Sequence, residues 1–352
     1  MATSGFLNQL DTTTNKELLP NVIDLTFKGD PALAYLRANC LDKFSGGIAW
    51  QEPFLFRVLK GSPIGYSKGD SFDVTQVQTK TGLTFDPRFY YVNASFYLED
   101  TEVLNNGPMA VIKLADSALQ EAALGMSARL SISMWRHGQN LAAENRSRAI
   151  NGLSEALTTS ATTTWDGNTF PNYGTVPRAD VGTALDAPVT GPAMNLAGSI
   201  TYDALERSYN SCYVGNEHPN IGITTNLGMS YVKLKFQPQQ RFETASTVAV
   251  GFTGVKFNGA EIMQSQYCPG SAGVNDADLG NYLLSGSETF WWLNAKKPFL
   301  KLRISTSAMF GFGTTGWKPA QNNNTVANQY LFSGNLTVPG PRYHRMLFGI
   351  TG

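Results

Sequence analysis

The hexapeptide GFGTTG at 311–316 has the G-x-G-x-x-G spacing of a dinucleotide-binding turn and follows a segment typical of a strand. In such sites a helix begins directly after the turn, because the helix N-terminus binds the pyrophosphate. Here WKPAQNNN follows, and Pro319 with an asparagine run does not favour that helix. We therefore predict a glycine turn and no nucleotide cofactor.

Metal-binding chemistry would need His, Cys and carboxylate residues at short, paired spacings. The three histidines are His137, His218 and His344, and none belongs to an HxxxH or HExxH pattern. Cys212 and His218 are close in sequence but have no second pair, so we predict a buried thiol and a surface imidazole. The sequence predicts no metal site.

The sequence also contains no motif typical of a hydrolase. Ser154 lies in GLSEA, which is typical of a helix and not of the GxSxG turn that holds a catalytic serine. No pattern pairs the candidate carboxylates, which are Glu121, Glu155, Glu206 and Glu288. Trp291 and Trp292 could form a sugar-binding platform, but FWWLN indicates a strand with one ring toward the core and the other toward an interface. We predict that the chain is not an enzyme.

Composition excludes further classes. The 27 basic and 27 acidic side chains cancel, so no net field favours tight binding of nucleic acid or of an anionic membrane. Only 15% of residues are charged and 42% are hydrophobic, which favours a sizeable core and contact with neutral surfaces. An odd set of distant cysteines (Cys40, Cys212, Cys268) indicates reduced thiols. Residues 1–15 do not resemble a signal peptide and no long apolar run is present, so we expect synthesis in a cytoplasm.

The longest predicted element runs from 109 to 138. Its apolar residues recur every three or four positions and would form one helical face: Ile112, Ala115, Leu119, Ala122, Met126, Leu130 and Met134. Polar residues, including Ser127 and Ser131, lie on or beside the opposite face. A helix of roughly 28 residues would be about 42 Å long, which is long enough to act as a strut.

Residues 50–100 have a different pattern, in which β-branched and aromatic residues alternate between glycine turns. The middle, 62–85, is too polar for burial on both faces, so we predict a long projecting hairpin that lies on another subunit.

The remaining segments predict an α+β protein. We expect a short helix after Asp30, a second helical pattern at 142–157 and a long irregular connection at 158–192. The expected later elements are a helix at 200–215 with Leu205, Tyr209, Cys212 and Tyr213 on one face, a buried strand at 221–225, a helix at 226–236 capped by Asn226, strands at 248–257, 290–293 and 299–305, and two C-terminal strands around 339–341.

This order of elements resembles the major capsid proteins of tailed bacteriophages, whose fold is named after the Hong Kong 97 phage. Short motifs are similar to positions of that family: GNL at 334–336, PR at 341–342, GI at 349–350, and the segments 151–157 and 202–229. YGTVPRAD at 173–180 is similar to the family's YGGIxR, from which it departs at Thr175 and Pro177.

The resemblance implies an α+β Hong Kong 97-like fold divided as follows: an N-terminal arm at 1–49, an extended β-hairpin loop with flanking strands at 50–100, a peripheral domain at 101–195 with its spine helix near 109–138, an axial domain at 196–325, and closing peripheral strands at 326–352. It implies hexamers and pentamers that self-assemble into an icosahedral procapsid and mature into a virion shell. That shell would enclose double-stranded DNA, contacted weakly and non-specifically, and would meet portal, scaffolding and decoration proteins. No membrane is involved.

For the subunit interface we select hairpin residues that a monomer cannot easily use: Arg57, Tyr66, Lys68, Asp70, Lys80 and Arg88. The alternative for each is a solvated hairpin edge. Some relatives cross-link a hairpin lysine to a neighbour's asparagine; Lys68 and Lys80 are candidates by position, but no partner is evident and we expect no cross-link.

Three other classes stay open. A β-rich virion tube, fibre or sugar-binding module would lack the long helix, whereas a cytoplasmic hydrolase would have a buried carboxylate in a cleft. An encapsulin-like compartment shell would share the fold and differ in its cargo.

Overall fold

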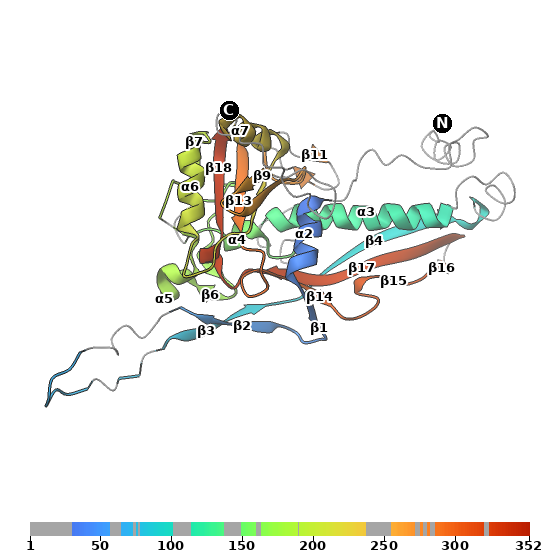
Figure 1. Ribbon diagram of the computed structural model, residues 1–352. Coiled ribbons are helices and arrows are strands. Elements are labelled where there is room, and N and C mark those ends of the chain that lie inside the picture. The colour runs from blue at the N-terminus through green and yellow to red at the C-terminus, as the bar shows by residue number, and fades with distance from the viewer. Residues whose placement is uncertain are drawn as a thin grey trace.

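The protein was analysed as a computed structural model. It describes residues 30–56, 65–72, 75–76, 78–100, 114–136, 149–159, 163–188, 190–236, 255–271, 275–276, 280–281, 286–319 and 324–352. Two six-stranded sheets, one long helix and a projecting ribbon are the main elements of this part of the chain (Figure 1).

The first sheet is built around the long strand β17 (Thr325–Thr337). On one side β17 pairs antiparallel with β4 (Arg88–Tyr97) along ten residue pairs, from Thr325 opposite Tyr97 to Gly334 opposite Arg88. On the other side it pairs with three shorter strands, β16 (Lys318–Pro319), β15 (Gly311–Thr314) and β14 (Lys301–Ser305). The strand β1 (Leu41–Phe44) completes this sheet, parallel to β14.

The second sheet has the order β7 (Asn195–Ser199), β18 (Arg345–Thr351), β13 (Glu288–Leu293), β8 (Ile221–Thr224), β10 (Ala260–Gln264) and β9 (Val255–Phe257). Helices α6 (Tyr202–Ser211) and α7 (Asn226–Phe236) lie beside it in Figure 1. Every residue of β8 and β13 is buried, which is typical of strands covered on both faces.

Adjacent tryptophans of β13 separate two hydrophobic cores. Trp291 belongs to the larger core and packs against Trp135 of the long helix at 5.2 Å between ring centroids. Trp292 belongs to the smaller core and packs against Tyr209 and Phe290. The expected interface on one side of this strand is therefore wrong, because a second core of the same chain covers that face.

The long helix α3 spans Leu114–Trp135, inside the expected 109–138; residues 109–113 and 137–138 lie outside the described part. At roughly 1.5 Å per residue it is about 33 Å long. Ala122, Met126, Leu130 and Met134 are buried, as the spacing predicted. Ser131, expected on the polar side, is also fully buried because the last turns of α3 are enclosed on all sides.

Several other predicted elements are confirmed with changed limits. In 142–157 the described helix is only α4 (Leu153–Ala156), and within 158–192 lie the hairpin of β5 (Asn172–Tyr173) and β6 (Val176–Pro177), followed by α5 (Arg178–Val181) and η5 (Gly182–Leu185).

The prediction that Tyr213 lies on the packed face of the helix at 200–215 is wrong, because Tyr213 follows the end of α6 and is half exposed. The cap of α7 is Thr225 and not Asn226, since Thr225 Oγ1 accepts a hydrogen bond from Gly228 N at 2.9 Å. The C-terminal strands β17 and β18 are confirmed, with the short helix η7 (Pro341–Tyr343) between them.

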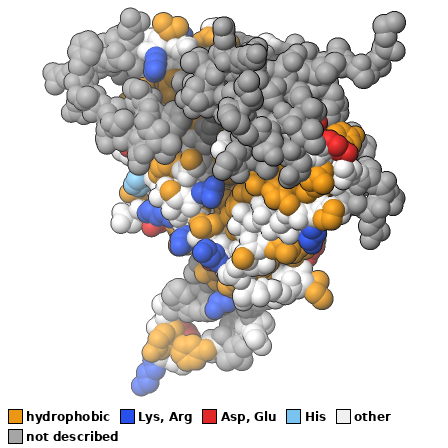
Figure 2. Space-filling view, turned by 90° about the vertical axis from the view of Figure 1, so that its right-hand side faces the viewer, with side chains coloured by type: hydrophobic (Ala, Val, Ile, Leu, Met, Phe, Trp, Pro, Cys, Tyr) orange, Lys and Arg blue, Asp and Glu red, His pale blue; other side chains and the backbone are white. Residues whose placement is uncertain are grey.

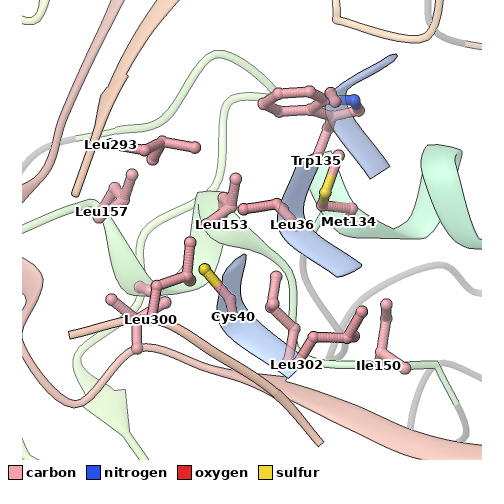
Figure 3. Packing of buried hydrophobic residues seen from close by; sticks show 14 of the residues in the cluster. Leu36, Cys40, Met134, Trp135, Ile150, Leu153, Leu157, Leu293, Leu300 and Leu302 are labelled. Carbon is pink, nitrogen blue, oxygen red and sulfur yellow. The ribbon is translucent and has the colours of Figure 1, made fainter. Parts of the chain in front are cut away.

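Sheet membership differs from the expected domain edges. Within the expected arm, α2 (Pro31–Cys40) is capped by Asp30 and packs into the larger core; in Figure 3 its Leu36 points toward Leu153, and its Cys40 lies between Leu300 and Leu302. Of the two closing strands only β17 belongs to the first sheet, whereas β18 belongs to the second. The strands β14 to β16, expected in the axial domain, pair with β17.

Candidate assembly surfaces

A two-stranded ribbon projects away from both sheets (Figure 1). The strand β2 (Trp50–Leu55) pairs antiparallel with β3 (Lys80–Phe85), and Phe56 N donates to Thr79 O at 3.1 Å beyond the last pair. Phe54, Leu83 and Phe85 are buried in the larger core. The hairpin predicted for this region is thus present, with its base joined to the body.

The described tip of this hairpin is a tight turn that carries two exposed rings. Ser67 N donates to Asp70 Oδ2 at 2.6 Å, and Asp70 N donates to Ser67 O at 3.1 Å. Tyr66 and Phe72 are 70% and 68% exposed, and their rings meet edge to face at 5.1 Å. Figure 2 shows hydrophobic and basic side chains together at the lower end of the molecule. Because aromatic rings contribute much of the binding energy of interfaces, the tip is a candidate contact surface.

The structure separates the residues selected for the interface. Tyr66, Lys68, Asp70 and Lys80 are exposed on the hairpin, whereas Arg57 lies outside the described residues. Arg88 is wrongly placed on the hairpin, because it begins β4 in the first sheet, opposite Gly334, and is half buried.

The first sheet has a second exposed aromatic surface, which we call the open face. Along β4, alternate residues are exposed: Phe89, Tyr91, Asn93, Ser95 and Tyr97. Leu331 of β17 lies opposite Tyr91, and Phe310, just before β15, meets the Phe89 ring edge to face at 6.1 Å. No charged residue lies among the five exposed positions of β4. Sequence reasoning missed this face, although the alternation in FYYVNASFY was its signal.

An ion cluster joins the hairpin base to the first sheet. Glu52 of β2 lies 2.7 Å from Lys301 Nζ and 2.6 Å from Arg303 Nη2, both on β14. Arg303 Nε also lies 3.1 Å from Asp42 Oδ2 on β1. No pattern in the sequence predicts this cluster, because the charges come from three segments that only the fold brings together.

The family-like GNL motif has a structural role at the same base. Asn335 Oδ1 accepts hydrogen bonds from Asn151 N and Leu336 N, each at 2.8 Å. Its Nδ2 donates to Asp86 O, between β3 and β4, also at 2.8 Å. Gly334 beside it is packed so closely that a Cβ would clash with Arg303 O. One amide therefore holds together β17, the hairpin exit and the segment before α4.

The YGTVPRAD segment also supports the hairpin. Gly174 and Thr175 form the turn of β5 and β6 with φ of 56° and 66°, and Gly174 O accepts from Thr84 N of β3 at 2.8 Å. Arg178 is fully buried and donates to the carbonyls of Phe170, Leu185 and Glu155. Burial lowers the pKa of this guanidinium, and Asp186 at 3.4 Å opposes that shift. The departures from YGGIxR thus leave a two-residue hairpin turn intact.

The remaining candidates for chemistry are structural. GFGTTG forms β15 and the turn before β16, and a Cβ on Gly313 would clash with the Ala308 carbonyl, so the glycine permits close backbone approach. The three cysteines are buried, and burial raises the pKa of the Cys40 and Cys212 thiols to about 12, which makes both unreactive. Within the described residues, no group of three His, Cys, Asp or Glu side chains could hold a metal ion.

The candidate nucleophile is buried, and the candidate acids Glu155, Glu206 and Glu288 bind neighbouring amides and hydroxyls of the fold. Ser154 is fully buried in α4. Buried Glu288 binds the hydroxyls of Thr225 and Ser271, whereas Glu206 accepts from the amides of Asn210 and Asn258. A core cavity of about 10 Å³ beneath α2 is lined only by apolar residues, and it is too small for a substrate.

Neither a family model nor a curated protein matches this sequence. Solved structures do match over nearly the whole chain. The capsid asymmetric unit of cyanophage A-1(L) has a TM-score of 0.66 at 12% identity and covers 95% of this chain and 96% of that one. The capsid of Myoviridae phage XM1 has a TM-score of 0.56 at 9% identity, with coverages of 95% and 97%.

A shell protein of a different kind matches as well. The holo-SrpI encapsulin complex from Synechococcus elongatus has a TM-score of 0.59 at 10% identity and covers 98% of this chain and 95% of that one. The chain therefore has the Hong Kong 97-like capsid fold, with mixed helix and sheet. None of the described helices has the length and apolar character needed to cross a bilayer.

Proposed function

We propose that this chain is the major capsid subunit of a tailed bacteriophage, which self-assembles into the icosahedral shell around double-stranded DNA. The observation that supports this most is a full-length match to phage capsid structures in a chain whose hairpin exposes Tyr66 and Phe72. A monomer gains nothing from two exposed rings on a projecting ribbon, whereas repeated contacts between copies would bury them.

In this proposal hexamers and pentamers form through the second sheet and its helices as axial domain, while the hairpin reaches a neighbouring copy. Tyr66, Lys68, Asp70 and Lys80 contact that copy, and Arg57 belongs to the same loop. The chain performs no catalysis and holds no cofactor. Its zero net charge suits weak, non-specific contact with packaged DNA. Portal, scaffolding and decoration proteins are its further partners, and it is made in the bacterial cytoplasm.

The experiment is to express the full chain in bacteria, sediment the lysate through a gradient and image the fast fraction by electron microscopy. We expect closed shells or tubes of hexamers. The double variant Tyr66→Ser/Phe72→Ser should remain as small oligomers, whereas the control Tyr66→Phe/Phe72→Tyr, which keeps both rings, should assemble. A stable monomer or dimer of the unaltered chain, with or without a scaffold, would contradict the proposal.

A compartment shell is the second candidate, because an encapsulin matches over 98% of the chain. The contents of the particles distinguish a phage capsid from a compartment shell. Particles isolated from the natural source should contain genome-length double-stranded DNA if the chain is a phage capsid subunit, and folded cargo enzymes if it forms a cellular compartment.

A further inference from the structure

Glu52 is the centre of a neutral ion cluster at the hairpin base and is only 4% exposed. Its Oε2 accepts a hydrogen bond from Lys301 Nζ at 2.7 Å, and its Oε1 lies 2.6 Å from Arg303 Nη2. Arg303 extends the cluster, with Nε 3.1 Å from Asp42 Oδ2 and its guanidinium 5.2 Å from the Trp50 ring centroid. Two carboxylates and two cations thus link β1, β2 and β14.

These ion pairs set the direction of the β2–β3 ribbon relative to β14, which apolar packing alone does not determine. Phe54, Leu83 and Phe85 bury the ribbon base, but hydrophobic burial is non-directional. Lys301 and Arg303 are two residues apart on β14, so they lie on the same face of the sheet and hold both oxygens of Glu52. A rotation of β2 relative to β14 would break at least one of these contacts.

The length of the hairpin magnifies any change at its base. Fourteen residues separate Leu55 from Gly69 and span at most about 46 Å at roughly 3.3 Å per residue, so a change of about 10° at the base moves the tip by at most about 8 Å. Such a displacement is larger than the range of any direct contact. The direction of the ribbon therefore decides whether the Tyr66 and Phe72 rings meet their place on a neighbour.

We propose that Glu52 is a positioning residue for assembly: through Lys301 and Arg303 it sets the direction in which the hairpin leaves the body. Its carboxylate is buried within the subunit, so it acts through these two partners. This inference rests on the proposed shell function. Replacing a whole buried ion pair often changes stability little, whereas removing one partner is destabilising because it leaves an unbalanced charge; the effect we assign to the complete pair is therefore on conformational specificity.

The first test measures the hairpin direction within single subunits. Spin labels go on Ser71→Cys at the tip and Ser199→Cys on β7, both exposed, while the native Cys40, Cys212 and Cys268 are buried and stay unlabelled. Below the concentration at which shells form, the unaltered cluster should give a narrow distribution of label distances. Glu52→Gln should broaden this distribution or shift it by several ångströms, because a small rotation at the hairpin base moves the tip by several ångströms.

Two further variants separate direction from stability. Glu52→Gln leaves the Lys301 charge less balanced, so the double variant Glu52→Gln/Lys301→Gln should restore the melting temperature without restoring the narrow distribution. Glu217→Gln removes an ion pair with Lys296, 2.6 Å long, that shares no residue with the Glu52 cluster, and should leave the distribution of label distances unchanged. A Glu52→Gln distribution identical to that of the unaltered chain would overturn the inference.

The second test measures assembly of the same variants by sedimentation. Both Glu52 variants should need about tenfold more subunit to form shells, or should form irregular ones, because a small loss at each contact is repeated around the shell. A changed distance distribution with unchanged assembly would also overturn the inference. If the unaltered chain forms no shell, the proposed function fails, and the distance measurement alone then decides whether Glu52 sets the hairpin direction.

Discussion

The two sheets of this protein are covered in different ways. In the second sheet, β8 and β13 have both faces buried by the chain's own side chains. In the first sheet, β4 packs one face against α3 and leaves alternate residues of the other exposed, from Phe89 to Tyr97. The centre of one sheet is thus covered within the subunit, whereas the other sheet keeps an uncharged aromatic face beside a projecting ribbon. We therefore expect mutations in the second sheet to affect mainly stability, and mutations on the exposed face of the first sheet to affect mainly assembly.

The largest loss of stability should come from truncating a buried tryptophan of the second sheet. Trp292 is fully buried, donates from Nε1 to Ser208 Oγ at 2.9 Å and contacts the Tyr209 ring. Trp292→Ala should lower the free energy of unfolding by about 3–5 kcal/mol, because it leaves a cavity and removes the hydrogen bond to Ser208 Oγ. Urea denaturation followed by circular dichroism measures this. Trp291→Ala, on the other side of the strand, should cost a similar amount; a loss below about 1 kcal/mol for either would contradict the two-core description.

The next effect concerns the connection between the sheets. His344 is fully buried beside β18: its Nδ1 accepts from Asn294 N at 3.0 Å and its Nε2 donates to Phe299 O at 3.2 Å. Burial lowers its pKa from 6.5 to about 4. Between these values the unfolded chain binds a proton that the folded chain does not, so stability falls as pH falls through this window. The loss should approach about 3 kcal/mol by pH 4.

Carboxylates also titrate in that window, so a difference measurement isolates the histidine. Unfolding free energies of the unaltered chain and of His344→Gln should be compared between pH 7 and 4.5. The variant should be less stable at pH 7 and should lose less on acidification. His218→Gln, at a partly exposed imidazole, is the control. Parallel pH curves for the unaltered chain and His344→Gln would contradict this assignment.

Periodicity along the chain predicted the elements that make local contacts. The spacing of Ala122, Met126, Leu130 and Met134 correctly indicated the buried stripe of α3, and the apolar run at 221–225 indicated the buried strand β8. It failed where distant segments decide the environment. Ser131 is buried because other segments surround the end of α3, and the second face of β13 is covered by α6, which a single-strand pattern cannot show.

Candidate site residues were predictable only in part for the same reason. Exposure of Tyr66 and Lys68 follows from the polar composition of their own segment. The Glu52 cluster needs a parallel pairing of β1 with β14 and a contact across 249 residues of sequence, from Glu52 to Lys301. Neither spacing nor composition encodes such a pairing, so the sequence alone does not predict the cluster.

A mutation on the open face should have the smallest effect on stability. It also tests most directly whether this face of the first sheet serves assembly. Tyr91 is 72% exposed at the centre of β4, opposite Leu331. Tyr91→Ser should change the unfolding free energy by no more than about 0.5 kcal/mol, because little buried area is lost. If the open face is a contact surface, the same change should strongly reduce shell formation, since exposed aromatic rings gain most when a partner covers them. Tyr91→Phe, which keeps the ring, is the matched control and should assemble. Unimpaired assembly of Tyr91→Ser would leave the hairpin as the contact surface and assign the open face to the shell's solvent-facing side.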